Sequence, residues 1–416
     1  MRKLRIILVW TIISLLWQGG AYFFLNNKVQ AVITPTVNKP ITLDLTATIP
    51  GSNLKNIQIS YAKDYLAYTE DGTFKVFNLV LGKQVFEKKS PSTTDKRLGV
   101  VTYQWLPDRN TLLYFYAKKN PNEVTTVKVY PTISRGKTST QTSTNVEFKK
   151  EDPNEKIEKV APQKVVPVEP RLEKRYGNPQ ITELYSLELP ESNDATPPDD
   201  RFNQAIDKLP KGGQIENLVF STSSNLIYLT VKNESTQLLI EIDVMKNVRT
   251  LNNSGEDIDN MAASDRYGTL YIDSEVGDIH QVIALDGTKR RIISKKSNDR
   301  ILGIRDGKVY LGEVLNDELV KIKSTADRTE LTNNPSLKTE WEGTIPFKNV
   351  RMLIGSEGQV VVYDHQTAHI VTDGQLKEIN LGGGENYVSF DGAELIQLSQ
   401  QGTSTVVKLK PLKSQE

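Results

Sequence analysis

The feature that most constrains the fold is a recurring pattern of short β-type runs separated by turn signals. Beyond residue 40, apolar or alternating runs are bounded by pairs such as Asp-Gly, Asn-Asn and Gly-Lys. β-Branched and aromatic residues dominate these runs, for example in 64–68, 73–77 and 226–231, as they do on pleated surfaces. Helical periodicity is nearly absent, so the sequence predicts an all-β domain.

The runs recur in units whose second strands lie about 35 to 50 residues apart, except for one longer interval. One position marks each unit: Leu66, Leu113, Ile227, Leu270, Val309, Val361 and Leu395. Four short strands with their turns need about this length, which is the size of a β-propeller blade. The spacing therefore predicts a β-propeller of about seven blades over residues 41–412, and it also allows six or eight.

The predicted units span 54–90, 100–190, 214–252, 258–295, 299–332, 348–381 and 385–412. The last unit is short by one strand. The alternating segment from Ile41 to Thr46 is a free strand that could complete it. Closing the ring in this way removes the open sheet edge that would otherwise invite aggregation.

One unit carries a recognisable motif, in which Trp105-Leu106-Pro107-Asp108-Arg109 precedes an apolar strand that ends near Phe115. This segment resembles the repeat of TolB-type and prolyl-oligopeptidase-type propellers, and the chain as a whole looks like a WD-repeat-like propeller. The resemblance implies that Pro107 and Asp108 form the turn between two strands, and that Trp105 packs between blades. Leu106 and Arg109 depart from the family pattern, in which a small polar residue and a glycine are usual. The resemblance concerns the fold and not the function.

One polar stretch, 132–180, interrupts the second unit, and a second polar stretch, 190–213, follows that unit. Residues 132–180 contain five prolines and many Ser, Thr and charged residues but only two aromatic residues, so the sequence predicts a flexible insertion there. In the second stretch, Phe202, Ala205, Ile206 and Leu209 lie at helical spacing behind Asp199. This spacing predicts one short amphipathic helix.

The N-terminal segment 6–25 contains no charged residue and, as a helix, would be about 30 Å long, which matches a bilayer core. Arg2, Lys3 and Arg5 precede it and only Lys28 follows closely. This asymmetry predicts a cytoplasmic N-terminus (1–5), a transmembrane anchor (6–25), a linker (26–40) and an extracytoplasmic domain. The alternative is a cleaved signal peptide, with Val29-Gln30-Ala31 as a mediocre cleavage site. Both alternatives export the domain.

Composition excludes several kinds of function. The chain has 52 basic and 51 acidic residues, and this balance argues against a nucleic-acid partner. It has no cysteine, which excludes disulfides, thiol catalysis and cysteine-ligated metals.

Three segments match binding motifs only in part. His365 and His369 have a zinc-like spacing, but strand-like flanks place them in a hairpin; the third histidine is His280. Residues 255–260, with Asp257 and Asp259, lack the glycine and the distal glutamate of a calcium loop. Residues 382–384 are three glycines without the Lys-Ser/Thr of a phosphate loop. The sequence therefore predicts no catalytic, cofactor-binding or metal-ligating residue.

The expected function is that of a non-enzymatic, membrane-anchored scaffold or recognition module of the cell envelope, with an envelope protein as its partner. The alternative is a protein that binds cell-wall glycan or a small ligand at the mouth of the channel. An enzyme would require a polar triad or a metal site in the channel. Three or more titratable groups converging there would argue against the non-enzymatic interpretation.

Overall fold

The computed structural model describes Gln18 and residues 45–129, 171–191, 193–194, 196–206, 209, 213–233, 236–327, 333, 335–382 and 384–412. The predicted anchor and linker, apart from Gln18, lie outside these residues, as do residues 41–44 and 130–170. Within the described residues, no helix has the length and apolar character needed to span a membrane.

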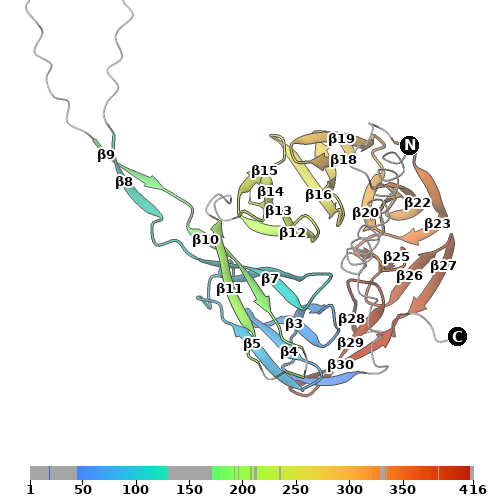
Figure 1. Ribbon diagram of the computed structural model, residues 1–416, viewed down its shortest axis with the longest axis horizontal. Helices are drawn as coiled ribbons and strands as arrows, with labels where there is room; N and C mark the ends of the chain where they lie inside the picture. The colour runs from blue at the N-terminus through green and yellow to red at the C-terminus, as the bar shows by residue number, and fades with distance from the viewer. Residues whose placement is uncertain are drawn as a thin grey trace, which may run out of the picture.

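The structure contains seven four-stranded antiparallel sheets arranged in a ring, which is a seven-bladed β-propeller (Figure 1). Blade 1 consists of β2 (Lys55–Ile59), β3 (Tyr65–Glu70), β4 (Thr73–Asn78) and β5 (Lys83–Lys88). Blade 2 consists of β6 (Gly99–Trp105), β7 (Thr111–Lys119), β10 (Gln180–Glu188) and β11 (Asp199–Ile206). Blade 3 consists of β12 (Gln214–Ser221), β13 (Leu226–Lys232), β14 (Gln237–Ile242) and β15 (Val248–Thr250).

Blades 4 to 7 complete the ring. They are β16 (Glu256–Ala263), β17 (Leu270–Val276), β18 (Ile279–Asp286) and β19 (Lys289–Ser294); β20 (Asp299–Arg305), β21 (Lys308–Leu315), β22 (Glu318–Ala326) and β23 (Lys338–Pro346); β24 (Arg351–Ile354), β25 (Val360–Tyr363), β26 (Thr367–Thr372) and β27 (Gln375–Asn380); and β28 (Glu385–Val388), β29 (Glu394–Gln401), β30 (Ser404–Pro411) and β1 (Thr46–Pro50). Blade 5 extends beyond the predicted end at residue 332, because β23 supplies its fourth strand.

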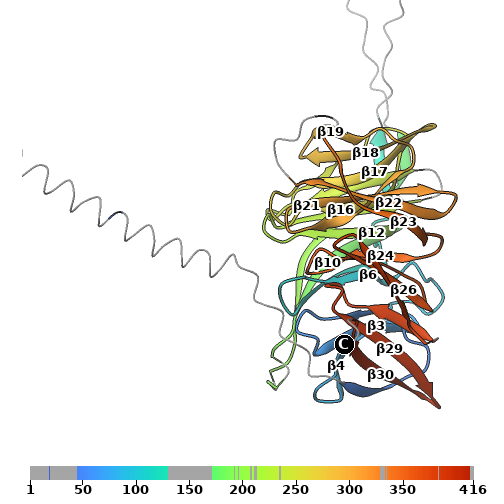
Figure 2. The same ribbon diagram turned by 90° about the vertical axis from the view of Figure 1, so that its right-hand side faces the viewer.

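In blades 1 to 6 the chain runs from the innermost strand outward, and in blade 7 it does so from β28 to β30, with β1 as the outer strand. The innermost strand of each blade is its first strand here, and all seven first strands run in the same sense along the central channel. The turns between first and second strands, and between third and fourth strands, therefore lie on one side of the ring, which we call face I. The turns between second and third strands, and the connections between blades, lie on the opposite side, which we call face II. Figure 2 shows the ring from its edge.

Several hairpins are built from the turn residues that the sequence offers. Asp71-Gly72, Asp306-Gly307, Asn316-Asp317 and Asp373-Gly374 all have positive φ at both positions, between 48° and 77°. Two-residue turns of this kind match the right-handed twist of the flanking strands, and Asp, Asn and Gly tolerate positive φ best. The Asp-Gly signals in the sequence thus correspond to tight hairpins.

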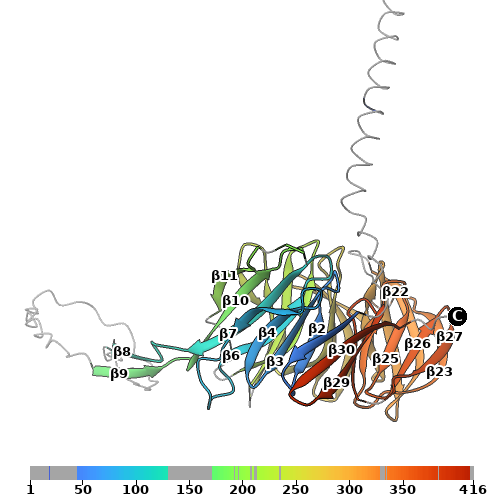
Figure 3. The ribbon, with the colours of Figure 1, turned by 90° about the horizontal axis from the view of Figure 1, so that it is seen from below.

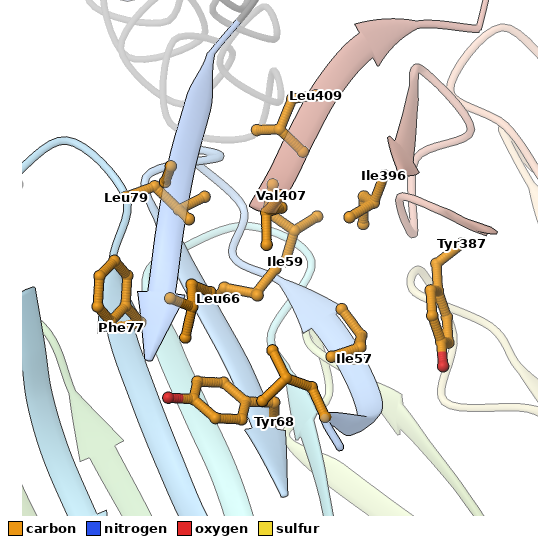
Figure 4. Close-up of a cluster of buried hydrophobic side chains, with 13 residues drawn as sticks. Ile57, Ile59, Leu66, Tyr68, Phe77, Leu79, Tyr387, Ile396, Val407 and Leu409 are labelled. Carbon is orange, nitrogen blue, oxygen red and sulfur yellow. The ribbon is translucent and has the colours of Figure 1, made fainter. Parts of the chain in front are cut away.

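A strand from the N-terminal side closes the ring, as predicted: it is β1 (Thr46–Pro50), which shares Thr46 with the predicted segment 41–46, while residues 41–44 lie outside the described residues. β1 pairs with β30 from Thr46 opposite Lys408 to Pro50 opposite Ser404. Its buried residues Ala47 and Ile49 join the cluster that seals blade 7 against blade 1 (Figure 4). Burial alternates along β1, so a shift of its pairing by one residue would turn Ile49 outward. The burial of Ile49 therefore fixes the register of the strand.

The motif around Trp105 behaves as the resemblance implied. Trp105 ends β6, Pro107 and Asp108 lie in the turn to β7, and the indole Nε1 donates a hydrogen bond to the Gln58 carbonyl of blade 1 (3.3 Å). Trp105 also packs with Tyr65 and other buried side chains of blade 1. A large side chain at this position therefore fills the space between two blades.

The predicted helix over 199–209 is wrong, because residues 199–206 form the edge strand β11. β11 pairs with β10 with one bulge, which places Tyr185 opposite Phe202. Asp200 accepts a hydrogen bond from the Tyr114 hydroxyl (2.6 Å) and pairs with Lys88 (2.9 Å). These contacts to blades 1 and 2 outweigh a helical spacing in the sequence, since local propensity is weaker than tertiary pairing.

Part of the predicted insertion 132–180 lies in strands. β9 (Arg171–Tyr176) pairs with β8 (Val124–Val129), and β10 begins at Gln180, whereas residues 132–170 lie outside the described residues. The β8–β9 ribbon extends outward from blade 2, beyond the rim of the ring (Figures 1 and 3). Gly177 N donates to the Glu123 carbonyl and Asn120 N to the Pro179 carbonyl, so hydrogen bonds fix the base of the ribbon.

Candidate functional site

The central channel holds a cavity of about 620 Å³, and the seven first strands surround it. Five of these strands (β2, β6, β12, β16 and β20) carry a bulge where they pair with the second strand. A bulge increases the local twist and redirects side chains. The repeated bulges therefore help to shape the channel wall.

The channel wall is mainly apolar, and its polar groups are largely occupied. Half-buried apolar side chains such as Val101, Ile304 and Leu353 line it. Asn260 Nδ2 donates to the Ile301 carbonyl (2.9 Å), and Gln58 Nε2 donates to the Tyr103 carbonyl (2.9 Å). These amides bridge adjacent blades, which leaves fewer of their donors for a ligand.

At the face I mouth the channel carries one carboxylate, Asp265, in the turn between β16 and β17. Burial raises the pKa of Asp265, while the nearby Arg305 guanidinium lowers it and the Asp108 carboxylate raises it. Phe390 lies at the same mouth with half of its side chain exposed. This mouth therefore combines one acid, one base and an exposed ring.

The channel wall near the start of the first strands contains a second cationic group. The Arg351 guanidinium lies 4.6 Å from the centroid of the Tyr387 ring, a cation–π contact. Burial raises the pKa of the Tyr387 hydroxyl, and so does the Glu385 carboxylate, whereas Arg351 lowers it. Within the described lining, Asp265 is the one carboxylate, and no histidine or metal-ligand cluster accompanies it.

A belt of polar contacts joins the turns of face I from blade to blade. It crosses five of the seven seams. The contacts are Ala62 N to Asn110 Oδ1 (3.1 Å), Ser221 Oγ to the Ser264 carbonyl (2.5 Å), Ser264 Oγ to Asp327 Oδ2 (2.5 Å), Ser356 N to the Asp391 carbonyl (2.8 Å) and Lys63 Nζ to Asp391 Oδ2 (2.7 Å). Because buried hydrogen bonds restrict side-chain and backbone motion, these contacts make face I a rigid surface.

The histidines lie apart. His365 is in the turn between β25 and β26, His369 is in β26, and His280 is in β18. His365 and His369 thus occupy a hairpin, as the sequence predicts. Arg300 Nη1 lies 3.2 Å from His280 Nδ1; since a guanidinium has no acceptor, Nδ1 accepts and Nε2 carries the proton.

The other sequence candidates also lie on structural elements. Asp257, Asp259 and Asn260 are on strand β16, and residues 382–384 connect β27 to β28. Neither segment forms a helix-opening phosphate loop or a calcium loop. The structure brings none of these candidates together at one point.

Sequence analysis missed two buried charge clusters. Lys63 pairs with Asp391 and with Glu394 (3.3 Å) across the seam between blades 1 and 7, and Lys323 pairs with Asp299 (2.7 Å) and Glu313 within blade 5. One sequence signal accompanies these buried carboxylates: a serine precedes an acidic residue by four or five positions. The pairs are Ser60–Asp64, Ser294–Asp299 and Ser389–Glu394, and in each of them the two side chains are hydrogen-bonded.

These features define the chain as a seven-bladed β-propeller. Solved structures that resemble it are propellers as well. The β-propeller domain of Cps50 (Swd1) from Myceliophteria thermophila has a TM-score of 0.47 at 10% identity, covering 87% of this chain and 97% of that one. The Dos1 propeller has a TM-score of 0.45 at 11% identity, covering 88% and 80%.

A third similar structure is the β-propeller domain of the Trilobed protease from Pyrococcus furiosus, with a TM-score of 0.43 at 9% identity, covering 88% of this chain and 97% of that one. No protein-family model matches the chain, and comparison with curated proteins gives no match. The fold assignment rests on the seven sheets themselves.

Proposed function

We propose that this protein is a non-enzymatic scaffold that binds a protein partner through face I. The observation that carries the proposal is the set of exposed apolar side chains on the rigid turns of this face: Val80, Leu81, Val244, Met245, Tyr267 and Phe390. Turn tips usually carry polar residues, so these exposed apolar residues favour face I as an interaction surface, since face II exposes fewer at its turns: Val276, Ile279 and Leu315. The belt includes Ser264 and Asp391, which lie on the turns of Tyr267 and Phe390, and holding these turns in place reduces the entropy lost on binding.

We also propose that the segment 6–25 anchors the protein in a membrane, with residues 1–5 in the cytoplasm and the propeller outside. The charge asymmetry around this segment supports the orientation. β1 begins at the face I side of blade 7, since Thr46 pairs near the end of β30 that points to face I. The chain leading from the anchor therefore joins the ring on the side of face I.

The absence of cysteine allows a direct test of this topology. Ser297→Cys, in the exposed connection between blades 4 and 5, should react with a membrane-impermeant maleimide in intact cells from which any outer barrier has been removed. Lys3→Cys should react only after the membrane is opened. Labelling of both positions, or of Lys3→Cys alone, in intact cells would contradict the proposed orientation.

A second candidate function is the binding of a cell-wall glycan or a small ligand in the channel. Its volume lies in the range of small-molecule sites, and Asp265 with Phe390 would offer polar and stacking contacts at the mouth. Affinity purification of the anchored protein separates the two candidates. One stoichiometric protein partner supports the scaffold; retention on purified cell wall without a protein partner supports the ligand-binding alternative.

A further inference from the structure

The β8–β9 ribbon is a two-stranded sheet that projects beyond the rim of blade 2 (Figures 1 and 3). A two-stranded ribbon is at best marginally stable alone, because independent stability requires three or more strands with an apolar face. Within the described residues, no strand pairs with the edge of β9 that points away from β8. The ribbon is therefore an incomplete sheet with an edge open to a further strand.

The hydrogen bond at the base of the ribbon shows which backbone groups lie on this open edge. Gly177 N donates to the Glu123 carbonyl (2.6 Å), which continues the register of the β8–β9 pair. Alternate residues of a strand direct their N–H and C=O groups to opposite sides. Leu172, Lys174 and Tyr176 therefore direct these groups away from β8, toward the open edge.

One face of the ribbon carries exposed apolar side chains. Val124, Leu172 and Tyr176 are 49%, 64% and 68% exposed, and Val124 lies directly opposite Tyr176. Since successive residues of a strand point to opposite faces, Leu172 lies on the same face as Tyr176. Exposed apolar residues beside an unpaired strand edge favour pairing with another strand.

From these features we propose that β9 pairs antiparallel with β9 of a second copy of this chain, about a two-fold axis at Lys174. In this register Glu173 lies opposite the partner's Arg175, and Leu172 lies opposite the partner's Tyr176, on both sides of the axis. Opposite charges and packed apolar side chains directly across two neighbouring strands stabilise a sheet. The sequence of β9 is thus complementary to itself.

Charge favours this register over its neighbour. An axis at Glu173 would place the two Glu173 carboxylates opposite each other and Leu172 opposite the partner's Lys174. The axis at Lys174 leaves one unfavourable pair, Lys174 with its own copy, and these exposed side chains can extend their ammonium groups into solvent. In the resulting four-stranded sheet, Val124, Tyr176 and the partner's Leu172 form a continuous apolar row.

Because the chain has no cysteine, a single introduced cysteine reports this contact in the full-length protein in detergent micelles. Lys174→Cys would lie opposite its own copy, with about 5.5 Å between the Cα atoms, so mild oxidation should give a disulfide-linked dimer. Thr126→Cys is the matched control, since Thr126 is exposed and lies directly opposite Lys174 on β8. It would lie three strand spacings, about 14 Å, from its own copy and should not cross-link.

Charge reversal tests the register. Glu173→Arg places an arginine opposite the partner's Arg175 and should weaken dimerisation at least about tenfold in analytical ultracentrifugation. The double substitution Glu173→Arg/Arg175→Glu restores opposite charges and should restore the dimer. A monomeric parent protein, equal cross-linking of Lys174→Cys and Thr126→Cys, or a double substitution that fails to restore the dimer would overturn the proposal. These outcomes would leave the scaffold function standing, since the contact uses no residue of face I.

Discussion

At the scale of single residues, the most consequential charge is Lys63, which is buried in the seam between blades 1 and 7. Its ammonium group pairs with Asp391 (2.7 Å) and Glu394 (3.3 Å), and both carboxylates are largely buried. Lys63→Met leaves them without a cation and should lower the free energy of unfolding by about 3–5 kcal/mol. Chemical denaturation measures this loss.

The control for this substitution is Lys89→Met. The Lys89 side chain is 80% exposed and makes one long ion pair with Glu87 (3.4 Å), so its removal should change stability by less than about 0.5 kcal/mol. Equal effects of the two substitutions would mean that the Lys63 cluster does not hold the seam.

His280 gives the molecule a defined pH dependence. Burial lowers the pKa of His280, and the Arg300 guanidinium lowers it further. The unfolded chain therefore takes up a proton near pH 6.5 while the folded chain does not, so stability falls as the pH decreases from about 6.5 to the lower pKa of the folded state. His280→Gln should flatten this part of a stability–pH profile; an unchanged slope would contradict the assignment.

At the scale of elements, β1 determines whether the ring is closed. Ile49 is fully buried between blades 7 and 1, whereas its neighbour Thr48 is exposed. Ile49→Ala should cost about 2–5 kcal/mol and Thr48→Ala less than about 0.5 kcal/mol, as measured by denaturant unfolding. Comparable losses at the two positions would indicate that the packing of β1 does not stabilise the closed ring.

The elements also show what the sequence can and cannot predict. The blade pattern is readable because alternating burial and Asp-Gly turns are local signals, and Trp105 identifies one seam. β11 is misassigned because the contacts of Asp200 and Phe202 come from Lys88, Tyr114 and Tyr185, which are far away in the sequence. The Lys63 cluster is not predictable for the same reason, since Asp391 and Glu394 come from the opposite end of the domain's sequence.

At the scale of the whole molecule, the two faces differ in what they present. Face I carries the hydrogen-bonded belt, the channel mouth with Asp265 and Phe390, and most of the exposed apolar turn residues, while Val276, Ile279 and Leu315 are exposed at turns of face II. Face II carries the connections between blades and the base of the β8–β9 ribbon. β1, the first described strand, starts at the face I side of the ring, since Thr46 pairs with Lys408 near the end of β30 that points to face I.

The most direct test of the scaffold claim compares charge substitutions on the two faces in affinity purification of the full-length protein from its own membrane. Met245→Asp and Phe390→Asp alter exposed residues of face I, and Ile279→Asp alters an equally exposed residue of face II. We expect one stoichiometric protein partner that is lost with the face I substitutions and kept with Ile279→Asp. Loss of the partner with Ile279→Asp alone, or no stoichiometric partner at all, would contradict the account.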